Sequence, residues 1–305
     1  MTAMPRLSVL SWGGIGDTLR NLSLVPHEFL HRRLGLRTAV FYKDWRETGA
    51  HAHALPPEGA FFQELVGRCP SLHWAGEGAG HKGLGRVMNR ALRDAMRLWN
   101  GGENHYFPFT IPLTPEETAA LPTFPAGPVI GIQTHLNGMH TKRWPLEHWA
   151  DLLRRILDQR PELQIVLLDS DPQVSGLGRD PRIRSTLGLN LAQSIALFRR
   201  FQLVVSIDSW SKYVAAWQRI PQLVVVPDQR SEYPGLTAAK LARDEFSGIW
   251  RDPRNRIIGL EGSRRAPRLT LPSMQALQPE QFYATLAPLL AALPGPPAAR
   301  SSEPA

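Results

Sequence analysis

The sequence has 305 residues, of which 43% are hydrophobic and 20% are charged, and its formal net charge is +8. This length suits two domains of about 125–150 residues each. The composition is that of an ordinary globular protein with an apolar core, which excludes fibrous and largely disordered classes. The single cysteine excludes an internal disulfide and suits a reducing compartment.

The N-terminal segment lacks the apolar core of a signal peptide, and no run of about 18 apolar residues predicts a transmembrane helix. We therefore expect a cytoplasmic protein. Its basic charge favours anionic partners, such as nucleotide phosphates or the anionic inner membrane, which it could contact peripherally. Because the cations are dispersed along the chain, no continuous basic face is predicted, and we expect no nucleic acid partner.

The chain begins with the pattern of a strand, a glycine-rich turn, a helix and a second strand. The apolar runs at 7–10 and 37–42 are the two strands. A strand–helix–strand unit of this length predicts parallel strands. The stretch 43–124 is harder to interpret and contains a basic amphipathic helix at 86–99. We interpret the Pro/Gly-rich run at 122–128 as an interdomain linker.

The second part of the chain alternates strands with helices. We predict strands at 129–132, 164–168, 203–207 and 222–226, and helices at 145–159, 191–201, 212–218 and 279–293. The strands are apolar throughout, which predicts a doubly wound parallel sheet covered on both faces. The Pro/Ala/Ser-rich tail at 294–305 is expected to be disordered.

The first candidate site is the turn Gly13-Gly14-Ile15-Gly16-Asp17. Glycines let the backbone approach a ligand closely. A carboxylate after a strand faces the crevice where α/β folds bind ligands. Asp17 could therefore be a general base, or it could only cap the following helix. No G-x-x-x-x-G-K-[ST] motif is present, so we expect no P-loop chemistry.

The second candidate site is the segment 141–145, in which Lys142 and Arg143 precede a helix. Two cations beside a helix N-terminus can form a phosphate site, since the free N–H groups there also attract anions. The alternative is a surface cation pair with Trp144 as a core anchor. The preceding loop contributes Thr134 and His135, but no paired metal-ligand spacing is present, and we expect neither a metal nor a cofactor.

The third candidate site is the junction Asp208-Ser209-Trp210-Ser211-Lys212, where a predicted strand ends and a predicted helix begins. Hydroxyl and backbone N–H groups at such a junction can bind pyrophosphate. The alternative is simple capping of the helix by these polar side chains.

Taken in order, these segments resemble glycosyltransferase family 9, the ADP-heptose:lipopolysaccharide heptosyltransferases. The resemblance rests on Gly-Ile-Gly-Asp at 14–17, Thr-Lys-Arg-Trp-Pro-Leu-Glu-His-Trp at 141–149, Val-Leu-Leu-Asp-Ser-Asp-Pro-Gln at 166–173, Leu-Gly-Leu-Asn-Leu at 187–191 and Asp-Ser at 208–209 followed by Val-Ala-Ala at 214–216. It implies a GT-B architecture, two Rossmann-like domains facing a cleft. Residues 1–124 would be the acceptor-side domain and 125–278 the nucleotide-sugar domain, with helix 279–293 packing back toward the first domain.

The resemblance also implies roles for individual residues. Asp17 would be the base that deprotonates the acceptor hydroxyl, with Gly14, Gly16 and His135 on the acceptor side. The implied donor-binding residues are Thr134, Lys142, Arg143, Gln173, Asp208, Ser209, Trp210, Ser211 and Lys212. The implied reaction is inverting and metal-independent. It moves a sugar, heptose by the family's name, from an ADP-linked donor to a surface glycan such as the lipopolysaccharide core.

The junction departs from the family pattern at two positions. Trp210 stands where the family has glycine, and Tyr213 stands where it has histidine. Two alternatives therefore stay open beside a glycan-directed transferase. One is a catalytically altered relative that binds a nucleotide sugar or another protein, and the other is a transferase with a protein acceptor.

Overall fold

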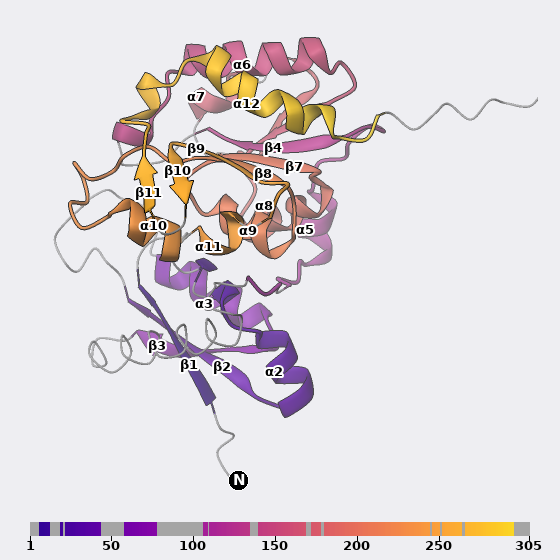
Figure 1. Cartoon of the computed structure of the whole chain (residues 1–305). Helices are drawn as coiled ribbons and strands as arrows, with labels where there is room; N and C mark the ends of the chain where they lie inside the picture. The colour runs from indigo at the N-terminus through magenta and orange to yellow at the C-terminus, as the bar shows by residue number, and fades with distance from the viewer. Residues whose placement is uncertain are drawn as a thin grey trace, which may run out of the picture.

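Parallel strands form the centre of both halves of the chain in the computed structural model (Figure 1). The structure describes residues 6–12, 19–20, 22–43, 58–77, 106–108, 110–134, 140–168, 172–177, 180–244, 246–250, 252–263 and 266–295. The predicted helix at 86–99 and residues 296–305 of the tail lie outside these ranges.

The N-terminal half contains a sheet with the strand order β1-β2-β3. Its elements are β1 (Arg6–Trp12), α2 (His27–Leu34), β2 (Arg37–Lys43), α3 (Glu58–Arg68) and β3 (Leu72–Glu77). Both strand pairs are parallel, which confirms the predicted strand–helix–strand unit. Helix α2 ends at Gly35, whose φ of 65° is left-handed and lets its N–H bond to the carbonyl of His31.

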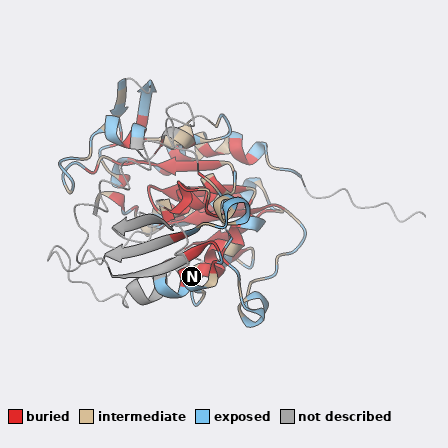
Figure 2. Cartoon of the chain, turned by 90° about the horizontal axis from the view of Figure 1, so that it is seen from below, coloured by how far each residue is buried: buried red, intermediate tan, exposed pale blue. Residues whose placement is uncertain are grey.

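The C-terminal half contains a six-stranded sheet with the order β6-β5-β4-β7-β8-β9. Its strands are β4 (Val129–Gln133), β5 (Gln164–Leu167), β6 (Ile183–Ser185), β7 (Leu203–Ile207), β8 (Gln222–Val225) and β9 (Arg256–Ile258). All five pairings are parallel, and β4, β5, β7 and β8 are buried along their whole length (Figure 2). The predicted doubly wound sheet is therefore confirmed.

Helices and a hairpin complete this half. They are η2 (His140–Lys142), α6 (Leu146–Gln159), α7 (Pro172–Ser175), α8 (Leu191–Leu197), η3 (Phe198–Arg200), α9 (Ser211–Trp217), α10 (Ala238–Asp244), α11 (Ser247–Trp250), β10 (Leu260–Ser263), β11 (Ala266–Leu269), η4 (Met274–Ala276) and α12 (Pro279–Ala291). The short helix α5 (Pro115–Ala119) lies on the segment that joins the halves. Among the described helices, none combines the length and hydrophobicity needed to cross a membrane.

The last helix, α12, packs on α6 across the C-terminal sheet from the N-terminal half (Figure 1). The ring of Phe282 lies 5.2 Å from that of Trp144 and 5.8 Å from that of Trp149. This placement differs from the expectation that the helix packs back toward the first domain. The physical reason is that the apolar stripe of α12, which includes Leu286, is covered by the complementary stripe of α6.

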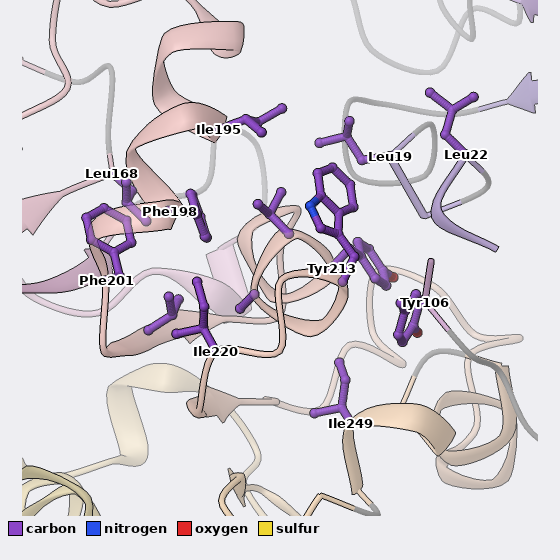
Figure 3. Close-up of a cluster of buried hydrophobic side chains, with 14 of the residues drawn as sticks. Leu19, Leu22, Tyr106, Leu168, Ile195, Phe198, Phe201, Tyr213, Ile220 and Ile249 are labelled. Atoms are coloured by element: carbon purple, nitrogen blue, oxygen red, sulfur yellow. The ribbon is translucent and has the colours of Figure 1, made fainter. Parts of the chain in front are cut away.

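One apolar cluster extends across both halves (Figure 3). It contains Leu19, Leu22 and Tyr106 from the N-terminal side and Tyr213 and Ile249 from the C-terminal side. The ring centroids of Tyr106 and Tyr213 are 5.9 Å apart. Because buried apolar side chains of both halves pack together, the halves share part of one core.

Cys69 lies in the same cluster and is 2% exposed. Burial raises the pKa of its thiol to about 12. The thiol therefore stays protonated at neutral pH, as expected of a structural cysteine and not of a reactive one.

Candidate functional site

The order of strands in the C-terminal sheet reverses at β4. The chain moves from β4 outward to β5 and β6, then returns to place β7 on the other side of β4. In open α/β sheets, ligands bind outside the carboxyl ends of the strands at such a reversal. Gln133 ends β4 and Asp208 follows β7, and Gln133 pairs with Ser206 in the register of these strands. The two residues therefore flank the expected binding position.

Two lysines converge on Asp208 at this position. Lys142 Nζ donates to the Asp208 carbonyl oxygen at 2.8 Å and to its Oδ2 at 3.1 Å. Lys212 Nζ donates to Oδ1 of the same carboxylate. Gln229 Nε2 donates to Oδ2 at 2.8 Å. All four residues are buried, and we call them the Asp208 cluster.

The Asp208 cluster retains its charges in spite of burial. Burial by itself raises the pKa of Asp208, but the ammonium groups of Lys142 and Lys212 outweigh it and hold the pKa well below its usual range. Two ammonium groups against one carboxylate leave these three side chains with a net charge of +1. Buried charge is costly, and such arrangements gather where a protein binds charged ligands.

Lys212 lies deeper than Lys142. It is 1% exposed, and its Nζ stands 4.6 Å from the ring centroid of Tyr213 and 4.5 Å from that of Phe246. These aromatic faces stabilise the ammonium group by cation–π attraction. Lys212 therefore serves as a fixed internal charge, whereas Lys142 approaches Asp208 from the turn η2.

The other predicted donor residues differ in how deeply they are buried. Thr134, directly after β4, is buried. Ser209 is 9% exposed, and Ser211 Oγ donates to Gln133 Oε1. By contrast, Arg143 and Gln173 are exposed, and Gln173 belongs to α7 after β5.

The predicted acceptor-side residues cannot be placed against this geometry. Asp17, Gly14, Gly16 and His135 all lie outside the described residues, and so their roles stay predictions.

The two positions that depart from the family pattern pack into the protein. Trp210 is partly buried, and its ring lies 5.6 Å from that of Phe198. Tyr213 is 4% exposed and packs against Tyr106. Both side chains thus belong to the apolar packing between α8, α9 and the N-terminal half.

Sequence analysis did not identify three polar residues at this edge. Gln133 accepts from Ser211, Gln229 bonds to Asp208, and Glu232 Oε1 accepts from the backbone N and Oγ1 of Thr141 at 3.1 and 2.7 Å. Gln229 follows a predicted apolar strand, which is the signal that singled out Asp208. The described residues contain no group of three His, Cys, Asp or Glu side chains suited to a metal ion.

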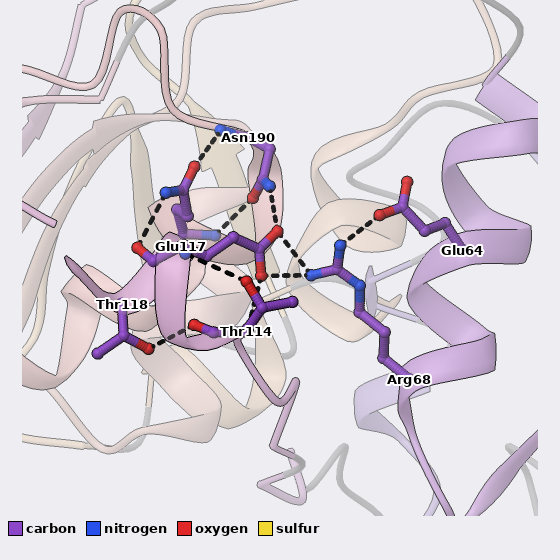
Figure 4. A network of polar contacts seen from close by, with 7 residues as sticks. Glu64, Arg68, Thr114, Glu117, Thr118 and Asn190 are labelled. Atoms are coloured by element: carbon purple, nitrogen blue, oxygen red, sulfur yellow. Dashed lines mark hydrogen bonds and ion pairs between the residues drawn. The ribbon is translucent and has the colours of Figure 1, made fainter. Parts of the chain in front are cut away.

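A second polar network joins the halves around Glu117 on α5 (Figure 4). Its carboxylate accepts from Arg68 of α3 at 2.8 and 2.7 Å and from Asn190, the N-cap of α8, at 2.6 Å. Glu117 also forms a capping box with Thr114. The bonds from Arg68 contribute most to lowering the pKa of Glu117 to about 2. This network helps to fix the orientation in which the two sheets face each other.

The central part of the chain is similar to one known family. Residues 110–226 match the family described as glycosyltransferase family 9 (heptosyltransferase). No curated protein has a matching sequence. The matched segment contains Lys142, Asp208 and Lys212, and it confirms the family resemblance expected from the sequence motifs.

Solved structures share the fold over almost the whole chain. The E. coli heptosyltransferase WaaC with ADP-2-deoxy-2-fluoro heptose has a TM-score of 0.53 at 13% identity, over 93% of this chain and 99% of that chain. The E. coli ADP-heptose lps heptosyltransferase II has a TM-score of 0.53 at 16% identity, over 94% and 99%. The dodecameric iron-containing glycosyltransferase TibC from enterotoxigenic E. coli has a TM-score of 0.52 at 14% identity, over 95% and 77%. These similarities confirm the predicted GT-B fold, and with the family match they support glycosyltransferase as the class of enzyme.

Proposed function

We propose that this protein transfers a sugar from a nucleotide-diphosphate donor to a hydroxyl group. The observation that carries the proposal is the Asp208 cluster, a buried net charge of +1 at the strand reversal of a family 9 segment. A diphosphate is the part of the donor that such a charge would attract. We propose ADP-heptose as the donor because three solved structures of this fold are named with ADP-linked heptose. A surface glycan such as the lipopolysaccharide core is the proposed acceptor.

The proposed reaction is an inverting displacement that needs no metal. The carboxylate of Asp17 takes the proton of the acceptor hydroxyl, whose oxygen then bonds to the anomeric carbon from the face opposite the diphosphate. The bond between that carbon and the diphosphate oxygen breaks, and the nucleoside diphosphate leaves. Lys142 stabilises the negative charge that develops on the departing group.

Calorimetric titration with ADP tests the donor site. We expect the wild type to bind ADP and Lys142→Met to bind it at least tenfold more weakly, because the variant loses the less deeply buried ammonium group of the Asp208 cluster. Lys240→Met is the matched control, since Lys240 is an exposed lysine on α10, and we expect it to retain wild-type affinity. If the wild type binds neither ADP nor ADP-sugars, the proposed donor site is refuted.

Asp17→Asn tests the chemical step separately. A general base contributes about 10²–10⁴-fold to a rate. We expect kcat to fall by a factor in that range while the affinity for ADP stays unchanged. Transfer at the wild-type rate would show that Asp17 is not the base.

A second candidate function is nucleotide-sugar binding without transfer. It is favoured by Trp210 and Tyr213, whose large side chains replace the smaller or titratable groups of the family pattern and pack into the protein. Binding of an ADP-sugar with no release of ADP in the presence of glycan or protein acceptors would favour this candidate over the transferase.

We also propose that α2 makes a peripheral contact with an anionic membrane. Phe29 and Leu34 are 55% and 61% exposed, and two of the four large hydrophobic residues exposed in the described ranges are on this helix. Phe29 lies one turn from Arg33, and Leu30 lies one turn from Leu34, so apolar and cationic side chains share one side of α2. Such a surface suits the interface of anionic lipids.

Sedimentation with vesicles tests this contact. We expect binding to phosphatidylglycerol vesicles and little binding to phosphatidylcholine vesicles. Phe29→Ser combined with Leu34→Ser should reduce binding, whereas Leu187→Ser combined with Tyr233→Ser, at the other exposed positions, should leave it unchanged. Equal loss in both double variants would argue against α2 as the contact.

A further inference from the structure

The segment that follows β8 lies beside Lys142 through two separate contacts. Gln229 reaches the Asp208 carboxylate, and Glu232 reaches Thr141, the residue directly before Lys142. We propose that Gln229 and Glu232 are positioning residues that hold the Lys142 ammonium group where it meets the donor diphosphate. This inference rests on the proposed function and assigns that site two residues from outside its recognised motifs.

Glu232 fixes the turn from which Lys142 extends. One carboxylate oxygen, Oε1, accepts from the backbone N of Thr141 at 3.1 Å and from its Oγ1 at 2.7 Å. Hydrogen bonds to a carboxylate are stronger than those between neutral groups. Since Thr141 and Lys142 are consecutive residues of η2, the carboxylate holds the backbone at the base of the lysine side chain.

Gln229 fixes the other end of that side chain. Its Nε2 donates at 2.8 Å to Asp208 Oδ2, the same oxygen that accepts from Lys142 Nζ at 3.1 Å. Gln229 is 2% exposed, so its amide is held inside the protein. The amide therefore sets the orientation of the carboxylate to which the ammonium group bonds.

The topology explains why this segment reaches the site. β8 pairs with β7 in parallel, so the residues that leave the carboxyl end of β8 emerge beside Asp208. The backbone N of Glu232 bonds to the carbonyl of Gln229 at 3.1 Å, and that of Tyr233 bonds to the same carbonyl at 2.7 Å. This turn connects the two positioning residues.

A flexible lysine gains most from being held in place before the ligand arrives, because less conformational freedom is then lost on binding. Loss of the contacts from Gln229 and Glu232 should therefore lower the affinity only for ligands that reach the Lys142 ammonium group. A merely structural role for the segment would instead weaken every ligand of the domain. Adenosine and ADP separate these cases, since only ADP carries the diphosphate.

The experiment compares ADP with adenosine, with calorimetry for ADP and NMR titration for adenosine, since NMR reaches millimolar affinities. We expect Glu232→Ala and Gln229→Leu to lower the affinity for ADP about tenfold and to leave the affinity for adenosine unchanged. Glu232→Gln keeps a carbonyl oxygen that can accept from Thr141, so it should stay within about threefold of the wild type. Asp228→Asn is the matched control, because Asp228 pairs with Arg230 in the same segment.

The outcomes separate this inference from the proposed function. If the wild type fails to bind ADP, the donor site itself is refuted. If the wild type binds ADP and Glu232→Ala and Gln229→Leu bind it equally well, only the positioning roles are overturned. A parallel loss of ADP and adenosine affinity would also overturn them, because it would indicate a structural effect. If Glu232→Ala does not fold, Gln229→Leu decides by the same comparison.

Discussion

The two halves of the molecule bury polar side chains in different ways. The N-terminal half buries His27, whose Nε2–H donates to the carbonyl of Leu22 while Nδ1 accepts from the hydroxyl of Thr38, both at 2.7 Å. This tautomer follows because a carbonyl can only accept. The C-terminal half buries an ionised carboxylate between the two lysines of the Asp208 cluster.

The cost of burial distinguishes these arrangements. Burial lowers the pKa of His27 to about 4, so the imidazole is neutral at pH 7 and needs no counter-charge. Buried ion pairs often stabilise a fold no better than apolar side chains of similar volume. The neutral histidine is thus sufficient for a structural role, whereas the net positive charge of the Asp208 cluster is what the proposed diphosphate site requires.

The largest expected effect is on the Asp208 cluster. Asp208→Ala leaves two buried ammonium groups without their carboxylate, and we expect it to reduce the free energy of unfolding by about 3–5 kcal/mol. Asp252→Ala removes a more exposed carboxylate paired with Arg254 and should cost less than about 1 kcal/mol. Urea denaturation measures both values. Equal small losses would show that the lysines escape to solvent and that the cluster is not held as described.

The next largest effect is the pH dependence of the free energy of unfolding that is due to His27. Between the unfolded-state pKa of 6.5 and the folded-state pKa of about 4, the unfolded chain binds more protons at this site. The contribution of His27 to the free energy of unfolding is therefore complete above pH 6.5. It is lost as pH falls toward 4, by roughly 3 kcal/mol in total. Urea denaturation between pH 7 and 4 should show this loss, and His27→Gln should remove it. The same slope in both proteins would assign the titration to another group.

The smallest expected effect on the free energy of unfolding comes from the ion pair of Arg68 and Glu117, which joins the halves. The pKa of Glu117 is lowered from 4.5 to about 2. Its contribution to the free energy of unfolding is therefore complete above pH 4.5 and is lost as pH falls toward 2. This window lies below that of His27. A double-mutant cycle of Arg68→Met and Glu117→Gln should give non-additive losses in unfolding free energy. Asp252→Asn removes the partner of Arg254, a separate pair, and should not couple to Glu117→Gln. Additivity in the first cycle would contradict the junction described.

The strands of the C-terminal sheet could be predicted because each is a continuous apolar run buried on both faces. β3 was not identified, since Leu72–Glu77 mixes apolar residues with histidine, glycine and glutamate. The partner of a helix is equally hard to predict, because an apolar stripe indicates burial without naming what covers it. The placement of α12 on α6 therefore had to come from the structure.

The candidate site could be predicted residue by residue but not as a cluster. Lys142 and Asp208 were each visible as polar groups where a regular element begins or ends. Their contact joins residues 66 positions apart, and no local pattern encodes it. For the same reason, Trp210 and Tyr213 could be recognised as departures from a family pattern, but their packing against Phe198 and Tyr106 depends on segments distant in sequence.

The packing of Tyr106 against Tyr213 has a consequence for protein engineering. A chimera that joined the C-terminal half of this chain to the N-terminal half of a relative would keep Tyr213 on α9. It would replace the surface around Tyr106 that covers this ring. Such exchanges between proteins of this fold should succeed only when both sides of the shared cluster are transferred together. The unit of recombination is therefore the pair of facing surfaces and not the single Rossmann-like domain.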